Sequence, residues 1–106
     1  MVFNVTFFSF FAENDNKITS GFLIASRKDR SIHIHRLAVA KDLKTKGIGK
    51  LLLEAIIAKT REVKLNRITL KVYKNNTAAI SFYQKLGFVV YIDEEDNHCM
   101  KLKLIH

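Results

Sequence analysis

A short run of lysines and glycines at residues 44–50, Lys-Thr-Lys-Gly-Ile-Gly-Lys, has the residue types and spacing of an anion-binding segment. The next segment has the apolar spacing of a helix, so the glycines fall where unpaired backbone N–H groups carry partial positive charge. Glycine lets an anion approach these groups without a Cβ in the way, and Lys44, Lys46 and Lys50 add charge. The run therefore predicts a pyrophosphate-binding turn. The alternative is a glycine-containing turn with incidental lysines, because neither Walker nor Rossmann glycine spacing is present.

Two histidines, His33 and His35, follow each other at the spacing of a strand. Residues two apart on a strand point to one side, so the histidines can line one channel, with Ile32, Ile34 and Arg36 on the other side. Imidazole titrates near neutral pH, which suits a general base. Two alternatives stay open: a solvent-facing histidine pair, and a chance metal site. Two histidines without further ligands bind metal weakly, so no metal is expected.

The spacing of apolar residues predicts the elements that must position these groups. The order is β-β-β-α-β-α-β-β, with strands at 2–11, 17–26, 32–40, 68–73, 88–92 and 99–105 and helices at 48–63 and 77–86. Gly87 is expected to end the second helix in a left-handed conformation. The β-α-β segment at 32–73 predicts a right-handed parallel crossover, so an α+β fold with a mixed sheet and helices packed on it follows.

The composition indicates one globular domain spanning residues 1–106, with 48% hydrophobic and 26% charged residues. No apolar stretch is long enough to span a membrane, and the phenylalanine-rich start, which lacks a basic segment, is interpreted as a strand. The lone Cys99 excludes an internal disulfide and indicates the reducing cytoplasm; a buried core thiol is its expected role. His98 and His106 are assigned to a turn and the tail.

The formal net charge is +8, and the positive charge is concentrated between residues 27 and 86. A central positive field favours an anionic ligand such as phosphate, nucleotide or nucleic acid, although a solvated lysine-rich surface gives the same composition. A small basic RNA-binding α+β domain is one function this allows. The aromatic and basic run that marks one common RNA-binding fold is missing from the sequence.

Two motifs resemble those of the GNAT superfamily of N-acetyltransferases. The first is Leu37-Ala38-Val39 followed by residues 44–49 and the leucines at 51–53. It is similar to motif A, in which Gln or Arg, two residues, Gly, one residue, and Gly or Ala open a helix after a strand; Lys44 replaces the Gln or Arg. The second is the run 76–88, which is similar to motif B: Asn-Thr-Ala-Ala, then Tyr-Gln-Lys-Leu-Gly-Phe. Both motifs lie in the order of the family, and the resemblance extends over residues 2–105.

The resemblance implies acetyl-CoA as co-substrate, direct transfer of its acetyl group to a primary amine, and roles for named residues. The backbone of Leu37, Ala38 and Val39 would pair with the pantetheine arm, which requires the third and fourth strands to splay apart. The turn would hold the pyrophosphate, and motif B would hold the pantetheine and the thioester end. The cofactor-binding residues implied are Leu37, Ala38, Val39, Lys44, Thr45, Lys46, Gly47, Ile48, Gly49, Lys50, Asn76, Ala79 and Tyr83.

Catalytic roles also follow from the resemblance. Tyr83 would be the general acid that protonates the leaving thiolate, and its spacing from Asn76 places both on one side of a helix; a core aromatic is the alternative. The run from His33 to Val39 is similar to serotonin (arylalkylamine) N-acetyltransferase, in which two histidines relay the proton of the amine through water. His33 and His35 are therefore the catalytic candidates for the base, with water alone as the alternative.

The acceptor half of the fold is the open question. The strand and two helices that usually begin a GNAT domain have no counterpart, so a minimal version is expected, and a homodimer is expected to supply the missing wall. The acceptor is a small molecule, a peptide N-terminus or an aminoacyl group, with nucleic acid expected only as the carrier of an amine. A CoA-binding regulatory module without catalysis is the competing function.

Overall fold

The computed structural model describes residues 7–13, 19–40 and 47–104, and the strands in this part form one six-stranded mixed sheet. The strand order is β1-β2-β3-β4-β6-β5, in which β3 and β4 are parallel and the other neighbours are antiparallel. The elements are β1 (Phe7–Glu13), β2 (Thr19–Lys28), β3 (Ser31–Val39), α1 (Ile48–Glu62), β4 (Arg67–Tyr73), α2 (Thr77–Lys85), β5 (Val89–Asp93) and β6 (Asn97–Lys103). The predicted order and parallel centre are confirmed, and the boundaries differ by a few residues.

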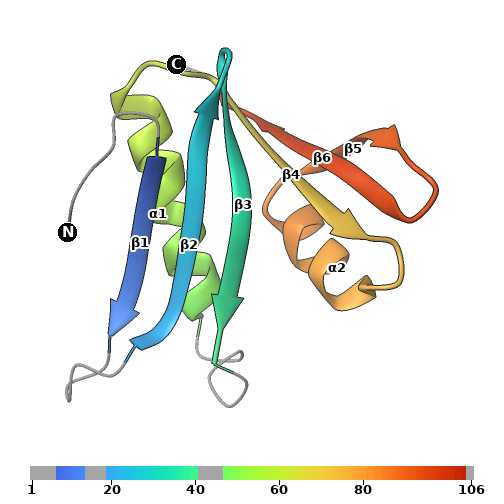
Figure 1. Cartoon of the computed structure of the whole chain (residues 1–106), viewed down its shortest axis with the longest axis horizontal. Helices are drawn as coiled ribbons and strands as arrows, with labels where there is room; N and C mark the ends of the chain where they lie inside the picture. The colour runs from blue at the N-terminus through green and yellow to red at the C-terminus, as the bar shows by residue number, and fades with distance from the viewer. Residues whose placement is uncertain (1–6, 14–18, 41–46, 105–106) are drawn as a thin grey trace.

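Both helices pack on the same face of the sheet, and Figure 1 looks onto the other face, with α1 behind β1–β3. α1 buries Leu53 and Ile56 completely, as its predicted apolar stripe requires, against strand residues such as Ile32 and Ile68. α2 buries none of its residues completely, and Ile80 and Phe82 are among those that pack partly against the same core. We call the face that points away from both helices the open face.

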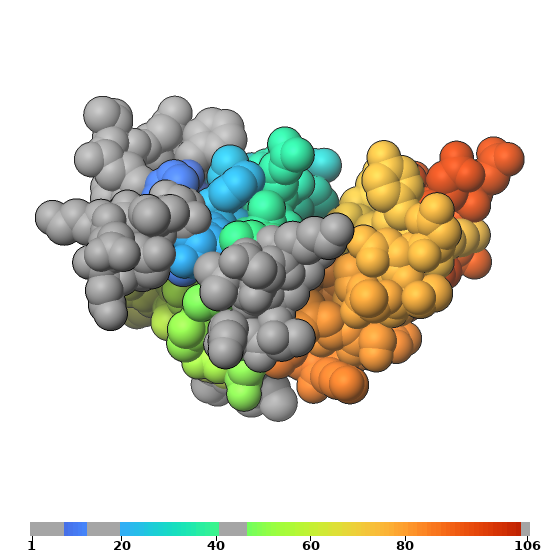
Figure 2. Space-filling view, turned by 90° about the horizontal axis from the view of Figure 1, so that it is seen from below, coloured from blue at the N-terminus to red at the C-terminus, as the bar shows by residue number. Residues whose placement is uncertain are grey.

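The central parallel pair is short. β3 and β4 share a register of three residue pairs, from Ile32 with Ile68 to Ile34 with Leu70, and the two strands diverge beyond it. Figure 1 shows the two halves of the sheet spreading apart from this point. Figure 2 shows them from the open end, with β2 and β3 in blue and green on one side and β4 and α2 in yellow and orange on the other. The splay that the resemblance implied is therefore present.

A bulge on β3 changes the predicted facing of its residues. On β2, Ile24 pairs with Arg36 and the next residue, Ala25, pairs with Ile34, so His35 is the extra residue. Arg36 was predicted to share a face with Ile34, and this is wrong. The bulge shifts the alternation by one residue, which places Arg36 opposite Ile24 on the open face and turns Leu37 towards the core.

Two glycines have the left-handed backbone that their positions require. Gly47 (φ 78°) is the N-cap of α1, and Gly87 (φ 102°) follows α2 and ends it as predicted. In the described part of the chain, no helix is both long and apolar enough to cross a membrane. The predicted strand residues 2–6 and the first three residues of the predicted turn, 44–46, lie outside the described residues.

Candidate active site

A cleft of about 700 Å³ lies where β3 and β4 diverge, between the start of α1 and α2. Nine of the predicted site residues line it: His35, Leu37, Val39, Gly47, Gly49, Lys50, Asn76, Ala79 and Tyr83. His33, Ala38 and Ile48 are not among its lining residues, and Lys44, Thr45 and Lys46 lie outside the described residues. Two motifs far apart in the sequence therefore meet at one cleft.

The strand edges that face each other across the cleft have no ladder between them. Pairing of β3 with β4 ends at Ile34, while β3 continues to Val39 and β4 to Tyr73. On its other side β3 stays paired with β2 up to Val39. Backbone N–H and C=O groups along the inner edge of β3 therefore point into the cleft. They can pair with an extended chain that carries amide groups.

The N-terminus of α1 opens into the cleft without a side-chain cap. Its N-cap, Gly47, has no side chain, and the first turn contains no acidic residue. The first backbone N–H groups of the helix are thus directed outwards with their partial positive charge uncompensated by a side chain. A Cβ built on Gly47 meets no atom within 4 Å, so the space beside the N-cap is open. An anion fits this end of the cleft, and Lys50 lines it as well.

Gly49 allows the two helices to approach each other at the cleft. A Cβ at this position would lie 3.2 Å from Cζ of Phe82 on α2 and 3.8 Å from Cγ2 of Val39 on β3. The second glycine of the turn therefore serves packing between α1 and α2, whereas Gly47 serves backbone conformation. From the sequence, the role predicted for both glycines was anion binding alone.

Asn76 is the N-cap of α2, and its Oδ1 accepts a hydrogen bond from the backbone N–H of Ala79 at 3.2 Å. Asn76 is also among the residues that line the cleft, and the Nδ2 group of its side chain is a hydrogen-bond donor.

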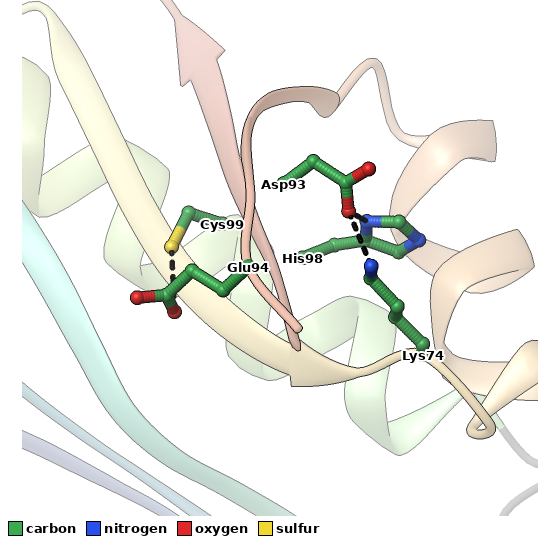
Figure 3. A network of polar contacts seen from close by, with 5 residues as sticks. All are labelled: Lys74, Asp93, Glu94, His98 and Cys99. Carbon is green, nitrogen blue, oxygen red and sulfur yellow. Dashed lines mark hydrogen bonds and ion pairs between the residues drawn. The ribbon is translucent and has the colours of Figure 1, made fainter. Parts of the chain in front are cut away.

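The turn between β5 and β6 supports the segment before Asn76. In Figure 3 Asp93 lies between Lys74 (Nζ to Oδ1, 2.8 Å) and His98 (Nδ1 to Oδ1, 3.2 Å). The backbone N–H of Lys74 donates to the carbonyl of Asp96 at 2.9 Å. The hydrogen bond from Lys74 is the main cause that lowers the pKa of Asp93. The β5–β6 turn is therefore joined by an ion pair and a hydrogen bond to Lys74, the residue that follows β4.

Tyr83 lines the cleft with its ring packed between Phe82 (ring centroids 5.5 Å apart) and Phe88 (5.6 Å apart). Burial raises the pKa of its hydroxyl above the ordinary value of a phenol. The hydroxyl therefore keeps its proton at neutral pH. The ring packs among other aromatic rings, as the alternative role of a core aromatic predicts, but Tyr83 also forms part of the cleft wall.

His33 and His35 lie against each other, with ring centroids 5.1 Å apart and an interplanar angle of 75°. His33 Nδ1 is 2.8 Å from Oγ1 of Thr69, and His35 Nε2 is 2.5 Å from Oγ of Ser26. Burial is the main cause that lowers the pKa of His33, and the positive fields of His35, Lys28 and Lys71 add to it. His33 is therefore neutral at pH 7, which a proton acceptor requires. Of the pair, His35 is the one among the cleft-lining residues, and it comes directly after Ile34, where pairing of β3 with β4 ends.

Several contributors to the site were not predicted. Lys71 and Tyr73 of β4 line the cleft, and Phe82 contacts it beside Gly49. For the two β4 residues, the sequence shows only the alternation of a strand, and this pattern does not indicate that one side of the strand borders a cleft. In the described ranges, no group of three or more His, Cys, Asp or Glu residues is placed to hold a metal ion.

Cys99 is buried, as predicted, on the β6 strand, and burial is the main cause that raises the pKa of its thiol. Its Sγ lies 3.6 Å from Oε1 of Glu94 (Figure 3). Glu94 also pairs with Lys71, at 3.0 Å. It lies outside the main core cluster. Nothing about it marks a nucleophile.

Comparison with known proteins agrees with this geometry. The model of the acetyltransferase (GNAT) family matches residues 3–88. The chain belongs to this family. Among solved structures, the PaiA N-acetyltransferase from Thermoplasma acidophilum, in complex with coenzyme A, superposes with a TM-score of 0.87 at 23% identity, covering 92% of this chain and 61% of that one. The splayed sheet is thus the GNAT fold.

Curated relatives differ in their named acceptors. The 5-NmdU N-acetyltransferase of Pseudomonas phage PaMx11 is 40% identical over 81 residues, which cover 74% of this chain and 55% of that protein. The probable spermine N(1)-acetyltransferase of Bacillus subtilis subsp. natto is 37% identical over 62 residues, covering 58% and 41%. The chain therefore spans about half the length of the curated relatives it matches.

Proposed function

We propose that this GNAT domain, residues 1–106, transfers the acetyl group of acetyl-CoA to a primary amine. The observation that carries the proposal is the end of β3–β4 pairing at Ile34, beside an uncapped helix N-terminus. One cleft thereby offers free strand edges, anion-binding N–H groups and a protonated phenol.

The residues present fit acetyl-CoA, as the open space beside Gly47 and the uncapped first turn of α1 indicate. The backbone of residues 47–50 would hold the pyrophosphate, with Lys44, Thr45 and Lys46 expected to contribute as well. The backbone of Leu37, Ala38 and Val39 would pair with the pantetheine amides, and Asn76 Nδ2 would donate to the same arm near Ala79. Bound acetyl-CoA supplies an acyl thioester, in which the carbonyl carbon is open to attack by an amine.

Tyr83 is proposed as the general acid. When the amine forms its bond to the acetyl carbon, the carbon–sulfur bond breaks and charge develops on sulfur. A hydroxyl in the cleft wall can donate its proton there. The raised pKa keeps that proton in place at neutral pH, although it also makes the donation less favourable.

His35 and His33 are proposed as the base. An ammonium group cannot attack a thioester, so its proton must first be accepted. His35 lines the cleft, and His33, in ring contact behind it, has a lowered pKa that keeps it neutral. The proton would pass through water to His35 and from there to His33.

Three further expectations belong to this proposal. The acceptor is a small molecule, a peptide N-terminus or an aminoacyl group. The protein acts in the cytoplasm, in keeping with one unpaired, buried cysteine. A homodimer completes the acceptor wall, in keeping with apolar residues left at the surface, such as Phe11 at the β1 edge (54% exposed).

Thermal shift and thiol release test the proposal together. Acetyl-CoA and CoA should raise the melting temperature because they bind only the folded state. Release of free CoA thiol with a panel of amines then distinguishes a catalyst from a CoA-binding module, which would show the shift without turnover. Failure of both ligands to stabilise the protein would overturn the proposal.

The Tyr83→Phe variant tests the acid. Turnover should fall by about 10²–10³, the scale of one acid–base group, while CoA still raises the melting temperature. Tyr91→Phe is the matched control, because Tyr91 is on β5 and is not part of the cleft lining. Equal rates for the two variants would remove Tyr83 from the mechanism.

A further inference from the structure

We infer that the open face of the sheet binds a single nucleic-acid strand and that this strand carries the acceptor amine into the cleft. The inference rests on the proposed acetyl transfer. It identifies the class of acceptor, which that proposal leaves open.

Six cations from four adjacent strands lie on this face: Lys28, Arg36, Arg67, Lys71, Lys101 and Lys103. Register places them there. Arg67 pairs with Lys103 and Thr69 with Lys101 across β4 and β6, and alternation along β4 puts Lys71 on the same side. Arg36 lies opposite Ile24 on β2 because of the bulge, and Lys28 lies opposite Ser31.

Side-chain contacts confirm the facing. Arg67 Nε donates to Oγ of Ser31 at 2.8 Å, and His33 meets Thr69 at 2.8 Å, so residues of β3 and β4 share this side. The fields of Lys28 and Lys71 both reach His33, since both contribute to lowering its pKa. The cations are therefore close enough to act as one positive surface.

Few anions offset this surface. Among the described ion pairs, Glu94 pairs with one of these cations, Lys71, at 3.0 Å. Asp93 pairs instead with Lys74, which follows the end of β4. Neighbouring strands are about 4.8 Å apart where they are paired, so Lys28, Arg67 and Lys103 span roughly 14 Å across β2, β3, β4 and β6. Arg36 and Lys71 lie beyond the last β3–β4 pair, where the strands diverge on the two sides of the cleft. Phosphates of a nucleic-acid backbone match a surface of this kind because they neutralise Lys and Arg with release of counterions.

Two exposed tyrosines adjoin the cations and favour a single strand. Tyr73, 65% exposed, follows Lys71 on the same side of β4, and Lys101 Nζ lies 5.4 Å from the ring centroid of Tyr91 on β5. Unstacked bases can stack on such rings, whereas the bases of a duplex are already stacked. A sheet face with aromatic and basic side chains is suited to a strand whose bases are accessible.

The surface leads directly to the chemistry. Lys71, His35 and Tyr73 belong to the cleft lining as well as to this side of the sheet. An amine on a strand lying across the open face therefore reaches the candidate base without crossing the anion site at α1. The same positive field repels polyamines, which carry several charges, and it favours the neutral form of an amine at the cleft.

Binding is the first test and is independent of acetylation. Fluorescence anisotropy of a labelled single-stranded oligonucleotide should show affinity that falls by up to about 300-fold between 50 and 200 mM salt, because six neutralised phosphates on a single strand give a slope of about −4. Lys101→Glu with Lys103→Glu should reduce the slope of log affinity against log salt by about 1.4, because each phosphate contact of a single strand contributes about 0.7. Arg61→Glu with Lys85→Glu, the same charge change on the helices, is the control and should bind better than the first pair.

Equal binding by the two double variants would overturn the inference, as would a duplex that binds more tightly than the single strand. A salt-independent affinity would do the same. Loss of the acetyl-CoA thermal shift concerns the proposed function instead, because the oligonucleotide measurement needs no coenzyme.

Acceptor kinetics is the second test. An oligonucleotide bearing one aminoalkyl group should have a kcat/KM above those of the same free aminoalkyl nucleoside and of spermidine. The Lys101→Glu and Lys103→Glu pair should raise KM for the oligonucleotide about tenfold and leave kcat and the rate with the free nucleoside unchanged. A higher kcat/KM with spermidine than with the oligonucleotide would refute the inference. So would a variant that loses the same factor of kcat/KM with the oligonucleotide and with the free nucleoside.

Discussion

Replacement of Gly47 separates the two demands that this position meets. Gly47 has φ 78° at the N-cap of α1, and an added Cβ would meet no neighbour within 4 Å. Gly47→Ala therefore adds no clash, and its cost is the left-handed backbone, about 1–2 kcal/mol. The reduced entropy of the unfolded chain returns about 0.4–1 kcal/mol. A net loss near 1 kcal/mol corresponds to a fall in melting temperature of roughly 4–8 °C.

The matched variant is Gly47→Asn, because asparagine tolerates the left-handed conformation and also caps helices. It should melt near the wild type, while both variants place a side chain beside the anion site and weaken the thermal shift by acetyl-CoA. Differential scanning calorimetry without ligand gives the backbone cost, and titration with acetyl-CoA gives the loss of affinity. An alanine variant as stable as the wild type would refute the reasoning on backbone strain. Unchanged affinity in both would refute the placement of the anion.

Three further outcomes follow. Because the pKa of His33 is lowered in the folded state, unfolded chains bind more protons, so the free energy of unfolding should decrease as the pH falls through about 6.5; His33→Gln should flatten this decrease in urea titrations from pH 8 to 5. Ile56→Ala should cost about 2–5 kcal/mol because the side chain is completely buried, whereas Leu51→Ala, 59% exposed, should stay within about 0.5 kcal/mol by the same titration. Asn76→Ala should cost about 1 kcal/mol through loss of the α2 cap and should also reduce the thermal shift by CoA, and a variant that keeps both would contradict its dual placement.

The sequence predicted the fold well where one residue type has one conformational consequence. Gly87 ended α2, the apolar spacing around Leu53 and Ile56 predicted the buried side of α1, and the order of strands and helices allowed the parallel crossover. The splay of β3 and β4 came from family resemblance, since nothing in the local sequence says where a parallel pair stops.

The bulge could not be read from the sequence. An extra residue in a strand keeps the local β-pattern and shows itself only through the register with β2, so Arg36 was placed on the wrong face. The two histidines also differ in a way that alternation does not show. His33 lies within the paired part of β3 and β4, beside Thr69, whereas His35 follows the last pair and lines the cleft. The cap formed by Asn76 was hidden for a similar reason, because its predicted ligand role and its structural role use different atoms of one carboxamide.

The short seam between β3 and β4 also bears on how the chain folds. On either side of Ile34 and Leu70 the sheet consists of antiparallel neighbours, β1–β2–β3 before the seam and β4–β6–β5 after it. β2 and β3 are adjacent in sequence, as are β5 and β6, so such hairpins require little loop closure. The seam joins residues separated by the whole of α1, and closing that loop costs more entropy. We expect each hairpin to assemble early and the seam to close last, so truncating Ile34 should mainly accelerate unfolding.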